Sequence, residues 1–367
     1  MALARCVETN NPILPDRKTV VRQDQVEDIY AKLAEDDAFL IISGVKGCGK
    51  STLLRQIEGL AQESGRTAVY IDKQVVWGKD PDGTADCLRQ KLGFDQEWVS
   101  AEDAAVQLKE RNIILLVDEY TALAYGEDVP EPMLPLVRLV KAAKSHSVPT
   151  ALVIHDIPEA INNGLQTLEL SQDCIVKPAP LVTGEIMRIL KHGTSYPRGG
   201  EPASLLGIEV EDSAGVAVME LAGDQAILVN LLIKELYIRQ ARVEKPSEKV
   251  TGAMFQELLQ DRDNLKFVCN STQTRRVFGF AIDYFNDNPE KVDTFVSTFT
   301  LEDYFLNRNW FQAGKKVEDT EISKNALDDQ DRQDWLRLGL VRDEEGQLVI
   351  NGEILADAIC GGWLFRR

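Results

Sequence analysis

Cysteine and histidine are scarce in this sequence, and long apolar runs are missing. The 367 residues include six cysteines and three histidines; no two cysteines form a CxxC pair, and the histidines do not cluster with them. This pattern predicts buried thiols in a reducing compartment and no structural zinc. The longest apolar runs, AFLIISGV and IILLV, are shorter than the roughly 18–20 residues of a membrane span. The first residues lack the apolar core of a signal peptide, so we expect a cytoplasmic protein with no membrane partner.

Positive charge is also in short supply. Lys and Arg number 41 against 59 Asp and Glu, which gives a formal net charge of −18. Such an acidic surface repels a phosphate backbone, so non-specific nucleic-acid binding is disfavoured unless basic side chains gather on one face. The composition is otherwise that of an ordinary globular protein, and the length is enough for two or three domains.

Short apolar runs alternate with amphipathic segments in the first half of the chain. The runs lie at 38–45, 67–72, 112–117 and 150–156, and apolar residues at helical spacing occupy much of the sequence between them. Continuous apolar strands that alternate with helices are typical of a parallel sheet covered on both faces. We therefore predict an α/β fold, with a P-loop NTPase core and a parallel sheet, over residues 1–180.

The rest of the chain is predicted to be mainly helical. Residues 181–250 carry helical patterns around a loop rich in Gly, Pro and Ser, which predicts a helical lid subdomain. Over 251–367, helical patterns precede the segment LGLVRDEEGQLVI, in which two β-rich stretches flank Glu-Glu-Gly and predict a hairpin. Helices followed by a late hairpin predict a C-terminal winged-helix-like domain.

The segment GVKGCGKS, which begins at Gly44, fits the phosphate-loop pattern G-x-x-x-x-G-K-[ST] at every fixed position. In such a loop the backbone N–H groups turn inward around phosphate, and the N-terminus of the following helix adds a positive end. We expect Lys50 to reach the β- and γ-phosphates as a catalytic residue and Ser51 to bind Mg²⁺. The residues predicted to bind the nucleotide here are Gly44, Val45, Lys46, Gly47, Cys48, Gly49, Lys50, Ser51 and Thr52.

Two carboxylates follow the apolar run at 112–117. They are Asp118 and Glu119, at the end of a predicted parallel strand, where ligands bind in open α/β sheets. Asp118 is expected to hold Mg²⁺ with Ser51, and Glu119 to act as the general base that polarises an attacking water. With the phosphate loop, the pair predicts an ATPase with ATP and Mg²⁺ as cofactors. A solvated strand end without catalytic function is the less favoured alternative.

The motifs GVKGCGKST and LLVDEY resemble those of the AAA+/STAND group of P-loop ATPases, and among them the small prokaryote-type ATPases related to origin-recognition proteins. The segment PDRKTVVRQDQVEDI is similar to the motif that opens the first helix in this group. That resemblance implies that Arg22 and Gln23 lie on the adenine side of the nucleotide, although Val21 replaces the usual glycine. MELAGDQAILVNLLIKEL is similar to the group's lid-helix segment. The resemblance implies ATP/ADP binding and contact with a protein partner or with further copies of the chain.

The sequence departs from the group where arginines are expected. No arginine lies between Arg138 and Arg188, the stretch that usually supplies an arginine to the neighbouring subunit, and Ala226 stands where the lid arginine is expected. His155 and Asp156 occupy positions at which Asn, Ser or Thr is more common, and a packed structural histidine is an equally good interpretation. An arginine finger contributes ~10³–10⁵ in rate where it operates. Its absence from the usual places predicts slow turnover and a nucleotide-held switch, unless Arg138, Arg188 or Arg239 takes its place.

Cys48, inside the phosphate loop, has two interpretations. The helix dipole and Lys50 would lower the pKa of its thiol and favour a redox switch. The favoured interpretation is a small residue that simply fits the turn.

The predicted winged-helix-like domain is a poor candidate for reading DNA. Over 251–367, Asp and Glu outnumber Lys and Arg by 21 to 14, whereas a groove-reading helix needs cations toward phosphate. The aromatic segments DYFLNRNWF and GGWLFRR suit core packing or protein contacts better. The favoured function is therefore a slow regulatory ATPase that acts as a nucleotide-dependent switch. The alternatives are a DNA-associated ATPase of initiator or transposition-regulator type and a nucleotide-binding interaction module without hydrolysis.

Overall fold

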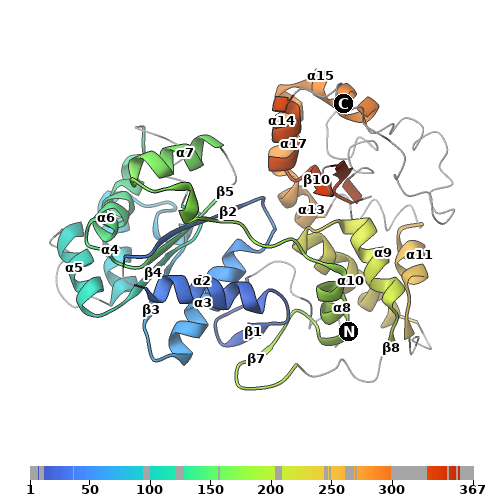
Figure 1. Cartoon of the computed structure of the whole chain (residues 1–367), viewed down its shortest axis with the longest axis horizontal. Coiled ribbons are helices and arrows are strands. Elements are labelled where there is room, and N and C mark those ends of the chain that lie inside the picture. Colours follow the sequence, from blue (N-terminus) through green and yellow to red (C-terminus); the bar gives the residue numbers. More distant parts are fainter. Residues whose placement is uncertain are drawn as a thin grey trace.

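The computed structural model describes most of the chain (Figure 1). The residues described are 7, 12–35, 37–93, 100–120, 128–155, 158–202, 209–243, 247, 249–260, 268, 271–298, 329–344, 347–352, 354 and 355. Within these residues, no helix has the length and apolarity needed to cross a membrane.

A five-stranded parallel sheet forms the first part of the molecule, in the order β3-β4-β5-β2-β6. β2, β3, β4 and β5 coincide with the four predicted apolar runs, whereas β6 was not predicted. The predicted α/β sheet is confirmed. Because the strands are parallel, the carboxyl ends of β2, β4 and β5 meet at one edge. The strands of this sheet are β2 (Phe39–Gly44), β3 (Ala68–Ile71), β4 (Ile114–Val117), β5 (Thr150–His155) and β6 (Ile175–Val176).

Helices cover both faces of the sheet, and alternate residues of each strand pack against opposite layers. Leu40 and Ile42 of β2 belong to a buried cluster with α2 and α3, whereas Phe39 and Ile41 belong to a cluster with α4, α5 and α6. This alternation buries the strands on both sides, which is why they read as continuous apolar runs. The helices of this part are α2 (Gln23–Ala34), α3 (Lys50–Glu63), α4 (Pro81–Leu92), α5 (Ala101–Glu110), α6 (Leu134–Ser145) and α7 (Pro158–Thr167).

The segment that connects β3 to α5 contributes a helix to the core of this part. A 3₁₀ turn (Lys73–Val75) leads to the twelve-residue helix α4, whose Leu88 and Leu92 are buried in the core. Asp80 caps this helix, because its side chain accepts a hydrogen bond from the N–H of Gly83 at 2.7 Å. Residues 94–95 lie outside the described part.

A second unit, on the right of Figure 1, contains the predicted lid helices. These are α8 (Thr183–His192), α9 (Asp212–Ala222) and α10 (Ala226–Gln240). They are joined by α11 (Gly252–Gln260), which belongs to the range predicted as the winged-helix-like domain and packs against α9. Two short strand pairs accompany them, which the sequence pattern did not predict. β1 (Arg17–Thr19) pairs with β7 (Ser195–Pro197), and β8 (Glu209–Val210) pairs with β9 (Lys249–Val250). The first pair fastens the N-terminal segment to the lid.

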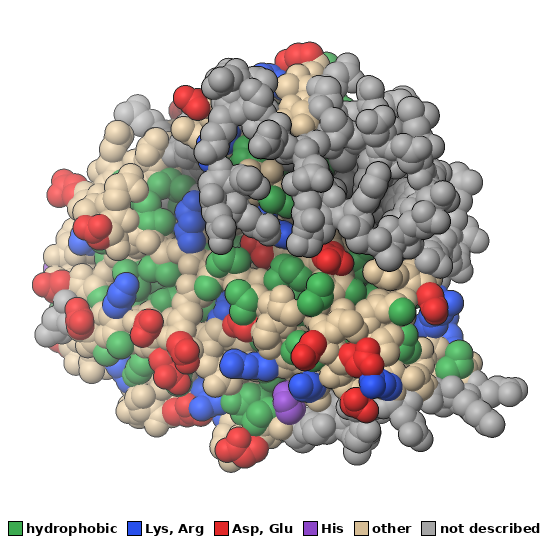
Figure 2. All heavy atoms as spheres, turned by 45° about the vertical axis from the view of Figure 1, so that its right-hand side comes forward, with side chains coloured by type: hydrophobic (Ala, Val, Ile, Leu, Met, Phe, Trp, Pro, Cys, Tyr) green, Lys and Arg blue, Asp and Glu red, His purple; other side chains and the backbone are tan. Residues whose placement is uncertain are grey.

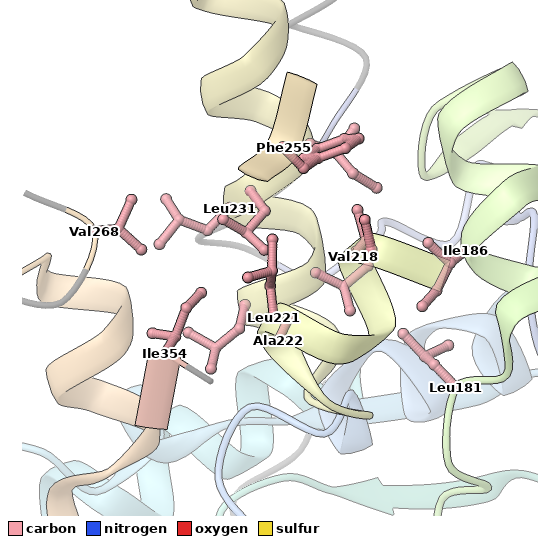
Figure 3. Close-up of a cluster of buried hydrophobic side chains, with 14 of the residues drawn as sticks. Leu181, Ile186, Val218, Leu221, Ala222, Leu231, Phe255, Val268 and Ile354 are labelled. Carbon is pink, nitrogen blue, oxygen red and sulfur yellow. The ribbon is translucent and has the colours of Figure 1, made fainter. Parts of the chain in front are cut away.

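The lid and the C-terminal elements share one hydrophobic cluster. Figure 3 shows Leu221 of α9, Leu231 of α10 and Ile354 gathered in it. Trp335 is fully buried and packs edge-on against Phe295, with ring centroids 4.8 Å apart. The aromatic segments singled out in the sequence lie outside the described residues.

The described C-terminal part consists of four helices and a hairpin. β10 (Val341–Glu344) and β11 (Gln347–Ile350) pair antiparallel, so the predicted hairpin is confirmed. The helices are α13 (Thr272–Val277), α14 (Gly279–Asp287), α15 (Pro289–Thr298) and α17 (Asp329–Arg337). The winged-helix assignment, like the three domain boundaries, stays a prediction.

Candidate functional site

The phosphate-loop motif connects the end of β2 to the start of α3, the predicted strand-loop-helix arrangement. Gly47 and Gly49 have φ of 84° and 103°, a left-handed backbone that favours glycine. Side chains also crowd both positions. A Cβ on Gly49 would lie 2.9 Å from Nη1 of Arg22, and a Cβ on Gly47 would lie 2.9 Å from side-chain atoms of Ile227 and Val277. The loop is therefore covered by the N-terminal segment, the lid helix α10 and α13.

Lys50 is buried at the start of α3, with 6% of its surface exposed. Its Nζ donates hydrogen bonds to the carbonyl oxygens of Gly44 at 2.6 Å and Val45 at 2.9 Å. A buried ammonium needs such acceptors, because an unpaired charge in the interior is costly. The loop carbonyls thus fix the lysine beside the amides at the helix N-terminus.

Asp118 directly follows β4 and lies beside the phosphate loop. It is 7% exposed, its Oδ2 accepts a hydrogen bond from the Tyr70 hydroxyl at 2.5 Å, and its side chain is also hydrogen-bonded to Ser51. Burial raises the pKa of the Asp118 carboxyl, and the bonds from Tyr70 and Ser51 oppose that rise. The structure thus brings together the two residues predicted from sequence to hold a metal ion, Ser51 and Asp118.

Glu119 lies next to this pair with an unusual backbone. Its φ is 50°, in the left-handed region that few non-glycine residues adopt, and its N–H donates to Oδ1 of Asp118 at 2.9 Å. The carboxylate makes an ion pair with Lys73, whose Nζ lies 3.0 Å from Oε2. Lys73 follows β3, so the neighbouring strand orients the predicted general base.

His155 ends β5 and lies opposite Gly44 in the register of the sheet. Burial, and then the charges of Lys50 and Lys46, lower the pKa of its imidazole to about 4. The histidine is therefore neutral at physiological pH. The structure places His155 at the site, whereas Asp156 lies outside the described residues.

Arg22 and Gln23, assigned to the adenine side by resemblance, point in different directions. The Arg22 guanidinium contacts the phosphate loop, where Nη1 donates to the carbonyl of Cys48. The Gln23 amide instead donates to the Thr19 carbonyl at 2.7 Å and the Tyr196 hydroxyl at 2.8 Å. Their assignment to the adenine side stays a prediction.

The remaining loop residues have local partners. The Thr52 hydroxyl accepts a hydrogen bond from the N–H of Ile13 at 3.4 Å. The Cys48 sulfur packs so close to Gly44 that a Cβ there would lie 2.9 Å from it. Burial raises the pKa of the Cys48 thiol despite the opposing effects of Lys50 and Arg22. The less favoured interpretation, a redox switch with a lowered thiol pKa, therefore loses its basis, because the loss of solvation outweighs the nearby cations.

Sequence reasoning missed two residues that hold the acidic pair, Tyr70 and Lys73. Both belong to the segment TAVYIDK. A tyrosine within an apolar strand is most simply interpreted as part of the hydrophobic core. Their function depends on β3 lying beside β4, and the order of strands in a sheet cannot be read from their order in the chain. Tyr70 is fixed in turn by Arg55, whose guanidinium carbon lies 3.4 Å from the centre of its ring.

Replacing Tyr70 by phenylalanine is expected to lower the free energy of unfolding by about 1–2 kcal/mol, because a buried carboxylate loses a hydrogen-bond donor. The ring that packs under Arg55 is retained. Tyr70→Leu, which also removes this cation–π contact, should cost more. Chemical denaturation of both variants tests the assignment, and it is wrong if Tyr70→Phe is as stable as the wild type.

Together, the sheet, the phosphate loop at the end of β2 and the acidic pair after β4 define the fold of a P-loop ATPase.

No protein-family model matches the chain, and a search of curated proteins finds no match. Solved structures do match. The chain is similar to the Walker-type ATPase paby2304 of Pyrococcus abyssi, with 12% identity, a TM-score of 0.57, and 96% of this chain and 99% of that chain covered. It is also similar to the ORC2 protein of Aeropyrum pernix, with 12% identity, a TM-score of 0.53 and 98% of each chain covered. The fold thus resembles that of archaeal ATPases related to origin recognition.

Proposed function

We propose that this protein binds ATP with Mg²⁺ in the loop 44–52 and hydrolyses it slowly, as a nucleotide-dependent switch. The contact between Ser51 and Asp118, beside the buried Lys50, carries the proposal. Hydroxyl and carboxylate oxygens are ligands that suit Mg²⁺, which commonly takes one or two carboxylates and completes its shell with phosphate and water.

Each residue of the site has a distinct function in this proposal. Lys50 binds the β- and γ-phosphate oxygens, and the loop amides bind the phosphate chain. Ser51 and Asp118 hold Mg²⁺, which when bound neutralises charge on the phosphates. Glu119, oriented by Lys73, accepts a proton from the attacking water. Since α10 begins at Ala226, the lid offers no arginine at that position, which supports slow turnover.

Contacts between the loop and the C-terminal elements support the function as a switch. Val45 packs near Gly339, in the turn before β10, where a Cβ would lie 3.3 Å from the Val45 side chain. On the lid, Asp224 accepts a hydrogen bond at 2.9 Å from Nδ2 of Asn351, just after β11. A change in the loop on nucleotide binding would reach the hairpin through these contacts. The recipient is proposed to be a protein partner or another copy of the chain.

Association with DNA is supported less well. On the face shown in Figure 2, acidic and basic side chains of the described residues are interspersed rather than gathered by sign. In α17, the helix that precedes the β10–β11 hairpin, Asp331 and Trp335 are buried in the core and not presented to a ligand. A salt series of DNA binding tests this alternative, because genuine phosphate contacts give a steep loss of affinity with salt.

Lys50→Met is expected to weaken ATP binding about 100-fold, since it removes a charge-assisted contact to phosphate. The measurement is titration with a fluorescent ATP analogue in the presence of Mg²⁺. Lys32→Met serves as the control, because Lys32 is exposed on α2 and its loss should leave the affinity within about twofold. Thermal melting without nucleotide checks that both variants fold. Failure of the wild type to bind ATP, or unchanged affinity in Lys50→Met, refutes the proposed site.

A further inference from the structure

The Arg22 side chain lies at the point where α3 presents its N-terminal amides. Nη1 donates to the Cys48 carbonyl, and a Cβ on Gly49, the N-cap of α3, would come within 2.9 Å of the same nitrogen. The N-terminus of a helix that opens a phosphate loop is where phosphate binds. The guanidinium therefore lies beside the predicted position of the phosphate chain.

Arg22 keeps hydrogen-bonding capacity in this position. A guanidinium has five N–H donors, yet its buried Nε has no hydrogen-bond partner among the described residues. Burial lowers the pKa of the group, while the charges of Cys48, Glu185 and Asp224 act in the opposite direction. A planar, partly unsatisfied guanidinium is suited to bidentate recognition of phosphate.

The backbone holds this side chain in place from the lid. Arg22 has a φ of 57°, a left-handed conformation uncommon for a non-glycine residue. Its N–H donates to Oε1 of Glu185 on α8 at 2.8 Å. Two carboxylates of the lid, Glu185 and Asp224, therefore lie within electrostatic range of the arginine, and α10 starts without a cation at Ala226. The described lid thus faces Arg22 with two carboxylates and has an alanine where the lid arginine is expected.

We infer that Arg22 binds the β- or γ-phosphate of the nucleotide and supplies, from the N-terminal segment, the positive charge that the lid does not provide at Ala226. The inference rests on the proposed function, because it needs a nucleotide in the loop 44–52. It differs from an adenine contact in a measurable way. A phosphate ligand affects all nucleoside triphosphates equally, whereas a base ligand affects the preference for adenine over guanine.

The test is competition of ATP and GTP against a fluorescent ATP analogue on wild type and Arg22→Gln. We expect Arg22→Gln to lower both affinities by about 10- to 100-fold, with the ratio of ATP to GTP affinity unchanged. Arg22→Lys keeps the charge without the planar fork and should lose less. A change in the ATP-to-GTP ratio, or undiminished affinity in Arg22→Gln, overturns the inference.

Arg17→Gln is the matched control. Arg17 belongs to the same N-terminal segment, but it donates to the hydroxyl and carbonyl of Ser195 at 2.8 and 2.9 Å and not to the phosphate loop. Its replacement loosens the segment while leaving the charge at the loop. An equal loss of affinity in Arg17→Gln would mean that anchoring of the segment, and not the Arg22 charge, is responsible. If the wild type binds no ATP, the proposed function fails; if it binds and Arg22→Gln binds equally well, only the assignment of Arg22 fails.

Discussion

Glu119→Gln is expected to lower the rate of ATP hydrolysis about 10³-fold, within the range that general-base catalysis contributes, while ATP affinity is retained. Glutamine has nearly the same shape as glutamate but cannot accept the proton of the attacking water. The partners that orient residue 119 through its backbone, such as the bond from its N–H to Oδ1 of Asp118, are unaffected. Phosphate release under single-turnover conditions measures the rate, because the wild-type reaction is itself expected to be slow.

Glu119→Gln also removes the ion pair with Lys73, so the experiment needs a control variant that loses an ion pair elsewhere. Glu209→Gln removes one partner of Lys249 in an exposed ion pair of 3.1 Å on the lid, and it should leave the rate within about twofold. Lys50→Met gives the background rate. If Glu119→Gln hydrolyses ATP as fast as the wild type, with both above that background, another group is the base and our assignment is wrong.

Much of the site could be predicted because it depends on local sequence. The apolar runs specify strands buried on both faces, and the spacing from Gly44 to Ser51 specifies a turn between a strand and a helix. Asp118 and Ser51 are far apart in sequence. They can be expected to lie close together, because the motifs that contain them follow parallel strands whose carboxyl ends meet at one edge of the sheet. Their hydrogen bond is therefore foreseeable once the two motifs are placed in one fold.

The residues that surround these motifs could not be predicted, because their positions depend on tertiary contacts. Tyr70 and Lys73 matter only since β3 lies next to β4. Arg22 reaches the phosphate loop because β1 and β7 fasten the N-terminal segment to the lid. The thiol of Cys48 shows the same limit, since its pKa depends on how deeply the surrounding structure buries it and not on the cations nearby in sequence.

Gly352, just after the hairpin, packs against the backbone of the lid at Ala222 and Gly223. This contact predicts a large loss of stability when Gly352 is replaced by alanine. Gly352 has a φ of 98°, and an added Cβ would lie 2.6 Å from the backbone nitrogen of Gly223 and 2.7 Å from the backbone carbon of Ala222. A left-handed alanine costs about 1–2 kcal/mol, and overlap with backbone that cannot move aside adds to it. We expect the free energy of unfolding to fall by at least about 3 kcal/mol, as measured by urea denaturation.

Gly199→Ala separates the two contributions. Gly199 has a similar φ of 78°, but nothing lies within 4 Å of the position of its Cβ, so this variant should show the backbone cost alone. Equal losses in the two variants would mean that the Gly352 and Gly223 backbones do not touch. A larger loss in Gly352→Ala would place the hairpin firmly against the turn that carries Asp224. Since Asp224 also lies within electrostatic range of Arg22, the same contact would connect the predicted phosphate site to the C-terminal hairpin.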